Sequence, residues 1–257
     1  MASELDNIEL RPARRRFMQG AAALATTLIA PGVLLYKTGH AQSENEANAG
    51  NKDRPAIPRW GLLIDTNALS EADVDACVSA CQREHGWSSD AGSPTDAQWI
   101  RKVHLTDKQS GQQTVLPMMC QHCADPPCVD VCPTGASFKR ADGIVLVNKH
   151  TCIGCRYCMM ACPYKARSFI HEVLQDQLAV APRGKGTVES CTFCVHRVDH
   201  AMLPACVEAC SANDHNAMTF GDMNDPDSEL SQQLKQYSSR QIRADLELNT
   251  GVRYRGI

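Results

Sequence analysis

The sequence has few aromatic side chains and no excess of charge of one sign. Phe, Trp and Tyr make up 5% of its 257 residues, so large rings contribute little to any buried core. Its 26 basic and 29 acidic residues give a formal net charge of −3, which offers no support for nucleic-acid binding. Hydrophobic residues at 43% and charged residues at 21% exclude a wholly disordered chain.

The sequence also lacks the motifs by which many enzymes handle substrates. It contains no P-loop, no glycine fingerprint for dinucleotides, no nucleophile elbow and no HExxH zinc motif. We therefore expect no catalytic residues, and we expect a chain that serves the chemistry of another protein.

Cysteine, in contrast, is abundant, with 14 residues in the chain. A chain this rich in thiols and this poor in large rings needs something bound by its cysteines to help hold the fold. The cysteines fall into four groups, which are Cys77-x3-Cys81, Cys120-x2-Cys123-x4-Cys128-x3-Cys132, Cys152-x2-Cys155-x2-Cys158-x3-Cys162 and Cys191-x2-Cys194-x11-Cys206-x3-Cys210.

The N-terminal segment predicts export. Residues 14–19 (RRRFMQ) fit the twin-arginine pattern, residues 17–36 are uncharged, and Gly39-His40-Ala41 offers a cleavage point. A membrane span is the alternative, because about 20 apolar residues suffice to cross a bilayer, but Pro31 interrupts this Ala- and Thr-rich segment. We expect residues 1–41 to be a twin-arginine signal peptide, either cleaved or kept as an anchor, and the protein to lie in the periplasm, peripheral to the inner membrane. Residues 42–57 predict a flexible tether.

The spacing of the third group is that of the bacterial ferredoxin motif for [4Fe–4S] clusters. The second group has the same form with a longer inner gap, and both end in Cys-Pro. Disulfides are an alternative in an oxidising compartment. However, the twin-arginine route exports folded proteins, so a cluster can be inserted before export. Zinc is the other alternative, because paired Cys-x2-Cys units also build tetrahedral sites. Two such motifs favour iron–sulfur clusters.

Over residues 58–257 the sequence resembles the four-cluster ferredoxin-type subunits that accompany molybdenum enzymes and membrane quinone modules, the DMSO-reductase β-subunit type. The segments that match are Trp60-Gly61-Leu62-Leu63-Ile64-Asp65, Cys120-Gln121-His122-Cys123-Ala124-Asp125-Pro126-Pro127-Cys128, Asp142-Gly143-Ile144-Val145, Cys152-Ile153-Gly154-Cys155-Arg156-Tyr157-Cys158, Ala161-Cys162-Pro163-Tyr164 and Gly221-Asp222-Met223-Asn224-Asp225-Pro226.

The resemblance implies that neighbouring cysteine groups exchange their last ligand. It implies three [4Fe–4S] clusters held by cysteine alone, with iron as the metal. Their ligand sets are Cys120, Cys123, Cys128 and Cys162 for cluster 1, Cys152, Cys155, Cys158 and Cys132 for cluster 2, and Cys191, Cys194, Cys206 and Cys81 for cluster 3.

The departure from the family is the loss of a fourth cluster. Two of the ligands it would need are replaced by Glu71 and Val74, which leaves Cys77 and Cys210 as two buried thiols, a disulfide or a reactive dithiol. A capping box at Ser70-Glu71-Ala72-Asp73 and apolar residues at positions 74, 77, 78 and 81 predict a helix in place of the ligand loop.

The resemblance implies an α+β fold of two ferredoxin-like iron–sulfur modules in pseudo-twofold relation, loop-rich with short strands and helices. We expect an outer module at 58–116 and 184–222 with one cluster, an inner two-cluster module at 117–183, and a C-terminal helix and tail at 223–257. Strands are predicted at 60–65, 100–106 and 144–148, a surface helix at 227–237, and an extended partner-contacting tail at 248–254, with loop elsewhere.

Several other polar residues stand near the cysteines in the sequence. His122 and His196 are expected beside the clusters or at the surface, since each group supplies its own thiolates. Arg156, Lys165, Arg167 and Arg197 are either ordinary surface charges or residues that tune cluster potential or dock a partner.

The resemblance implies a non-catalytic electron-transfer subunit in a hetero-oligomer. One partner is expected to be a quinone-interacting integral membrane subunit, and the other a multihaem c-type cytochrome or a catalytic reductase subunit. With one cluster lost, the chain is most similar to the periplasmic iron–sulfur subunits of sulfite-reductase-linked Dsr membrane complexes in sulfur metabolism. The alternative is a β subunit of a molybdenum reductase for polysulfide, tetrathionate or similar acceptors, or of a formate-dependent nitrite reductase system.

Overall fold

The computed structural model describes residues 57–90, 93, 95–175, 177–211 and 216–257. The predicted signal peptide and all of the predicted tether except Ile57 lie outside the described residues. From Ile57 onward the chain belongs to one structural unit. Among the described residues no helix is long and apolar enough to cross a membrane.

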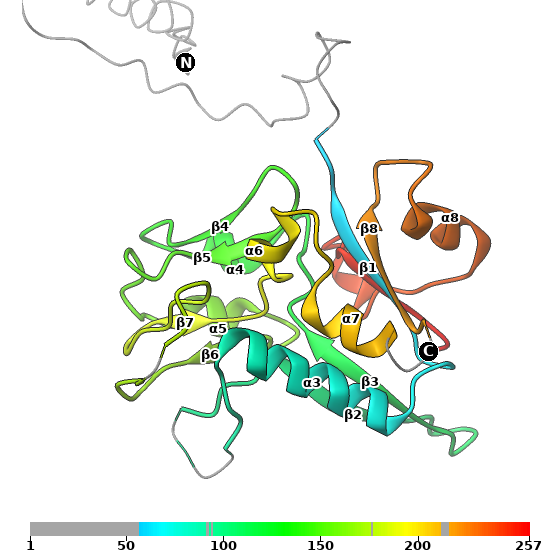
Figure 1. Ribbon diagram of the computed structural model, residues 1–257, viewed down its shortest axis with the longest axis horizontal. Coiled ribbons are helices and arrows are strands. Elements are labelled where there is room, and N and C mark those ends of the chain that lie inside the picture. The colour runs from blue at the N-terminus through cyan, green and yellow to red at the C-terminus, as the bar shows by residue number, and fades with distance from the viewer. Residues whose placement is uncertain (1–56, 91–92, 94, 176, 212–215) are drawn as a thin grey trace, which may run out of the picture. The chain divides into compact units, whose positions relative to one another are not determined.

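A three-stranded sheet joins the two ends of the described chain (Figure 1). Strand β1 (Trp60–Asp65) pairs antiparallel with β8 (Met218–Asp222) and parallel with β9 (Val252–Arg255). The strand predicted at 60–65 is therefore confirmed, whereas β8 was expected to be loop. Of the tail predicted to be extended at 248–254, residues 252–254 belong to β9, whereas Asn249 has a positive φ of 42°. Val252 and Tyr254 are 0% exposed and pack in the chain's own core. The contact of the tail with a partner stays a prediction.

Helix α3 (Glu71–His85) is the longest helix of the described chain and confirms the helix predicted around Cys77. Ser70 Oγ accepts a hydrogen bond from the Asp73 N–H over 3.2 Å, and Asp73 Oδ2 accepts one from the Ser70 N–H over 2.9 Å. This reciprocal cap satisfies two N–H groups that the first turn leaves open. The helix ends at Gly86, whose φ of 64° is favourable for glycine.

Helix α3 packs against a hairpin and a second helix (Figure 1). The hairpin consists of β2 (Ile100–Thr106) and β3 (Gln113–Met119), paired antiparallel from Ile100–Met119 to Thr106–Gln113. Strand β2 confirms the prediction at 100–106, and β3 is an additional strand that contains Pro117. Proline is tolerated there because the sheet has only two strands, so β3 is an edge strand. The second helix is α7 (Ala205–Ser211), in the segment after the fourth group's long gap.

The second and third cysteine groups carry short elements in the same order. Each group contains a one-turn helix, and a strand of a two-stranded sheet follows its last cysteine. These elements are α4 (Pro127–Asp130), β4 (Ser137–Lys139) and β5 (Val145–Val147), then α5 (Tyr157–Ala161), β6 (Ser168–Phe169) and β7 (Val188–Glu189). Strand β5 lies within the strand predicted at 144–148, and β6 pairs with β7 across the module boundary expected at residue 183.

The remaining elements are α6 (Val195–Val198), α8 (Glu229–Gln236) and a 3-10 turn, η1 (Ala244–Leu246). Helix α8 confirms the helix predicted at 227–237, and Ser228 Oγ caps it by accepting from the Ser231 N–H over 3.1 Å. This mixture of helices and small sheets, joined by long loops, is the expected α+β class. The pseudo-twofold relation between modules stays a prediction.

Candidate metal centres

The first set of four cysteines lines one cavity and is named centre 1. Each of its side chains is 7% exposed. They come from the loop before α4, from α4 itself and from the residue after α5. The sequence analysis placed the same four residues together, namely Cys120, Cys123, Cys128 and Cys162.

The second set lines another cavity and is named centre 2. Its members are Cys132, Cys152, Cys155 and Cys158. Centre 2 is the more open of these two sites, because Cys155 is exposed and only Cys158 is fully buried. Burial raises the pKa of the Cys132 thiol, but the Ser137 N–H, which donates to its sulfur over 3.3 Å, and the Thr134 hydroxyl outweigh burial and lower the pKa. These donors favour the thiolate, the form that binds metal.

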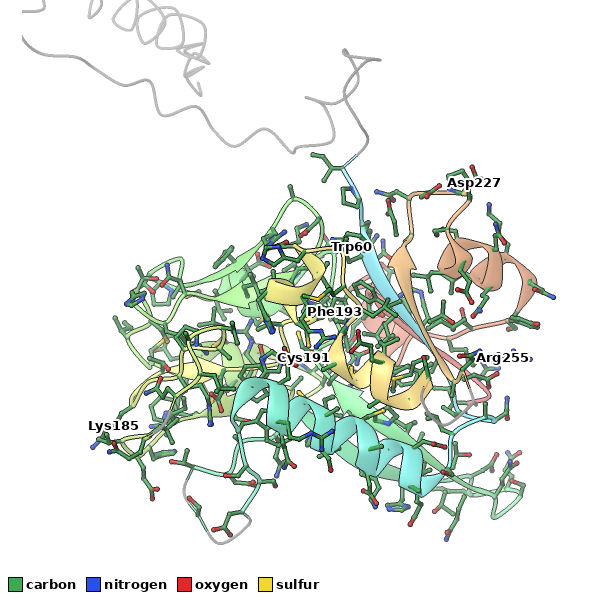
Figure 2. All side chains as sticks on the ribbon, in the orientation of Figure 1. Trp60, Lys185, Cys191, Phe193, Asp227 and Arg255 are labelled. Atoms are coloured by element: carbon green, nitrogen blue, oxygen red, sulfur yellow. The ribbon has the colours of Figure 1, made fainter. Side chains whose placement is uncertain are left out.

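The third set, centre 3, is assembled from distant parts of the chain. Its members are Cys81 from α3, Cys191 and Cys194 from the loop after β7, and Cys206 from α7. All four are at most 6% exposed, and the pKa of Cys191 is raised by burial and by the nearness of the other three thiols. Figure 2 shows Cys191 near the middle of the described chain, whereas Lys185 lies at its edge.

Two rings from the end of α3 contact the sulfurs of centre 3. Trp87 Nε1 donates a hydrogen bond to Cys81 Sγ over 3.2 Å, and His85 Nε2 lies 3.2 Å from Cys194 Sγ. Burial, assisted by the nearby His196, lowers the pKa of His85 to about 4, so its ring is neutral at pH 7. Hydrogen bonds of this kind orient metal ligands and tune the metal they hold.

The thiols of these sets are ill suited to be charged without a metal. Burial, followed by the neighbouring thiols, raises the pKa of Cys120, Cys123 and Cys206 to about 12. Thiolates there require nearby positive charge, which bound iron supplies. Among the described residues, no three His, Cys, Asp or Glu side chains converge closely enough for a single metal ion. The cysteines of centres 1 and 2 instead surround cavities, and this arrangement fits a cluster of several atoms with soft sulfur ligands.

Comparison with known proteins agrees with this donor chemistry. Residues 112–223 match the model of the 4Fe-4S dicluster domain family. The Hdr-like menaquinol oxidoreductase iron-sulfur subunit 1 of Archaeoglobus fulgidus is 37% identical over 267 residues, which cover 94% of this chain and 97% of that protein. This chain belongs to the ferredoxin-type iron–sulfur subunits of oxidoreductases. The family inferred from the cysteine spacing is thereby confirmed.

Other members of this iron–sulfur subunit family are similarly close. A putative dimethyl sulfoxide reductase iron-sulfur subunit of Halobacterium salinarum is 46% identical over 200 residues, which cover 72% of this chain and 74% of that protein. A sulfite dehydrogenase subunit of Allochromatium vinosum is 38% identical over 204 residues, which cover 72% and 78%. Their names describe subunits of larger oxidoreductases, and the family model describes 4Fe-4S centres. The number of clusters in this subunit stays a prediction.

His122 and Phe193 connect centres 1 and 3 of this iron–sulfur subunit. Each is the residue immediately before a ligand cysteine and has a left-handed backbone, with φ of 43° and 51°. Their rings stack with centroids 3.7 Å apart. His122 is 2% exposed, its Nδ1 accepts from the Val145 N–H over 3.0 Å, and burial lowers its pKa to about 3. Of the alternatives predicted for His122, the structure excludes the surface one.

Arg167 connects centres 1 and 2. Its Nη2 donates hydrogen bonds to Cys128 Sγ over 3.1 Å and to Ser137 Oγ over 2.8 Å. The guanidinium also lies near Cys120 of centre 1 and Cys158 of centre 2. Arg167 is only 5% exposed, so the interpretation as an ordinary surface charge is wrong for this residue.

The other polar residues singled out from the sequence lie farther from the sulfurs. Lys165 is exposed, and the exposed Arg156 lies over the Phe169 ring, 4.9 Å from its centroid. His196 and Arg197 both bind Glu84 at the end of α3, over 2.7 Å and 3.1 Å. These two residues therefore tie α6 to α3.

Cys77 and Cys210 lie outside the three centres of this subunit. Both are 0% exposed and neither forms a disulfide, so the structure does not contain the disulfide considered from sequence. Cys77 hydrogen-bonds to the Cys210 side chain, and its Sγ is 3.5 Å from the Cys206 carbonyl oxygen. The hydrogen bond to Cys210, together with burial, raises the pKa of Cys77 far above its usual range. At neutral pH Cys77 is a buried protonated thiol.

Proposed function

We propose that this iron–sulfur subunit carries electrons through three [4Fe–4S] clusters, one at each centre. The observation that supports this most is the gathering of twelve cysteines into three sets of four, joined by residues that touch two sets at once. Each bound cluster accepts and releases single electrons. The chain itself supplies no catalytic residue in this proposal.

The residues of the chain hold the clusters apart and set their surroundings. His122 and Phe193 fix the spacing between centres 3 and 1, and Arg167 fixes the spacing between centres 1 and 2. The deep burial of centres 1 and 3 excludes water, whereas the exposed Cys155 makes centre 2 the easiest for an outside partner to approach. Burial and hydrogen bonds to sulfur are the means by which a protein sets cluster potential.

The subunit works, in this proposal, in a periplasmic complex of dissimilatory sulfur metabolism of the sulfite-reductase-linked Dsr type. Its partners are a quinone-interacting integral membrane subunit and a multihaem c-type cytochrome or other redox protein. The relative named as a subunit of a menaquinol oxidoreductase supports the first partner. The relative named as a sulfite dehydrogenase subunit supports the sulfur chemistry.

The second candidate is the β subunit of a periplasmic molybdenum reductase for polysulfide, tetrathionate or a similar acceptor, or of a formate-dependent nitrite reductase system. The relative named as a dimethyl sulfoxide reductase subunit favours the molybdenum alternative. Affinity purification of the tagged subunit from detergent-solubilised native membranes separates the candidates. Co-purifying c-type haem without molybdenum supports the first candidate, and stoichiometric molybdenum supports the second.

The three-cluster proposal is tested by measuring iron and acid-labile sulfide per chain in protein purified without air. Three clusters correspond to about 12 atoms of each. About 16 of each would show a fourth cluster on other ligands, and about 8 would show that one of the three centres is not a cluster site. Either result contradicts the proposal.

A further inference from the structure

Arg167 is a buried cation without a carboxylate partner. Among the described residues no Asp or Glu forms an ion pair with it. The buried Arg183 shows the usual arrangement, with Nε and Nη2 each donating to Glu189 over 2.8 Å. Burying an unpaired ion costs several kcal/mol, so Arg167 requires negative charge from another source.

The groups around Arg167 identify this source. Its nearest neighbours are the Cys128 and Cys158 sulfurs, one from each of two centres, and the Ser137 hydroxyl. Two further donors of the guanidinium, Nε and Nη1, are buried and find no acceptor among the described residues. Thiolate ligands and inorganic sulfide of bound clusters supply both the negative charge and the acceptors that this environment lacks.

We propose that Arg167 is a positioning residue shared by centres 1 and 2. Its charge raises the reduction potentials of the clusters at both centres. This inference rests on the proposed function, because it requires clusters at these centres. Reduction adds an electron to a cluster, and a nearby fixed cation with N–H donors stabilises the added charge. The guanidinium remains charged at any working pH. Among the described residues, the sulfurs found to interact with Arg167 belong to centres 1 and 2, so the effect is expected at these two clusters.

The test is a redox titration followed by electron paramagnetic resonance on the complete protein, purified without air. Arg167→Gln removes the charge and keeps a polar side chain with N–H donors. At a fixed potential, the ratio of reduced to oxidised cluster is expected to fall about tenfold at two centres, which is about 59 mV for one electron. The signal that Cys81→Ser eliminates is assigned to centre 3, and its potential is expected not to shift in Arg167→Gln. Arg240→Gln is the matched control, because Arg240 is exposed, lines neither cavity of centres 1 and 2, and is expected to shift none of the three.

The proposal is overturned if Arg167→Gln leaves all three potentials unchanged, or shifts all three equally. If that variant does not retain its clusters, Ser137→Ala decides, because the Ser137 hydroxyl holds Nη2 between the two centres and, without it, the charge is no longer fixed beside their sulfurs. A fall of about twofold in the ratio at centres 1 and 2 alone supports the proposal, and unchanged ratios overturn it. Iron and sulfide are measured in the same preparations. About 12 irons with unshifted potentials refute the role of Arg167 alone, whereas fewer in the unmodified protein refute the three-cluster function itself.

Discussion

The ligand loops and helix α3 present their cysteines in opposite ways. In the loop of the third group, Gly154 and Arg156 have left-handed backbones, with φ of 69° and 64°, and these turns direct closely spaced cysteines toward one site. No residue of α3 has a positive φ. Cys77 and Cys81 are four residues apart and share one face of α3, but they lie one turn apart along the helix. Cys81 therefore reaches centre 3 while Cys77 meets Cys210. A regular helix therefore does not gather its cysteines around one site as the loops of the second and third groups do.

The largest expected effect is a difference in iron content between variants of the two cysteines of α3. We expect Cys81→Ser to remove the cluster of centre 3, with iron falling by about four per chain. Cys77→Ser, one turn away on the same helix, is the matched variant and is expected to keep all of the iron. Iron and acid-labile sulfide in anaerobically purified protein provide the measurement. Iron loss in Cys77→Ser would contradict the assignment of Cys81 as the ligand.

The second prediction concerns Val74, which stands where the family resemblance implies a ligand cysteine. Val74 is 0% exposed against the core, so Val74→Ala is expected to destabilise the protein by about 1.5–3 kcal/mol. The measurement is the urea midpoint, followed by loss of cluster absorbance without air. Val180→Ala, at a side chain that is 54% exposed, is the control and is expected to have little effect. Equal midpoints for the two variants would show that α3 does not fill the lost site by packing.

The parts of the fold predicted from sequence are those set by neighbouring residues. The cap of α3 depends on Ser70 and Asp73, three positions apart, and the strands at 60–65 and 100–106 were predicted from the residues that they themselves contain. The second strand of the hairpin was not predicted, because Pro117 argues locally against a strand and only its position at an edge permits one.

Some features of the candidate site were likewise predictable from the sequence, and others were not. The cysteine sets follow from spacing and from the family's pattern. The burial of His122 and Arg167 was not predictable, because their partners Val145 and Cys128 lie 23 and 39 residues away along the chain. These contacts form only when the second and third cysteine groups fold against each other. A pattern of neighbouring residues therefore does not predict them.

The third prediction compares the loss of the N-terminal cap of α3 with the loss of the N-terminal cap of α8. Ser70 and Ser228 cap α3 and α8 with the same hydrogen bond, so replacing either with Ala is expected to cost about 1 kcal/mol. Only Ser70→Ala is expected to accelerate loss of the centre 3 signal in an iron chelator, because α3 bears Cys81 and α8 bears no cysteine. Equal signal loss in both variants would show that the helix cap does not support the centre.

The smallest expected effect is at the other end of α3, where the helix is held by charge. The side chain of Glu84 is 24% exposed and binds His196 and Arg197 of α6, the helix that follows Cys194. Because such partly solvated pairs contribute little, Glu84→Gln is expected to destabilise the protein by under about 1 kcal/mol. The deficit in urea midpoint is expected to shrink in about 1 M NaCl, where the screening length falls to about 3 Å. A deficit that is independent of salt would indicate that Glu84 acts through hydrogen bonds to α6 that Gln cannot reproduce, and that charge does not join the helix to the ligand loop.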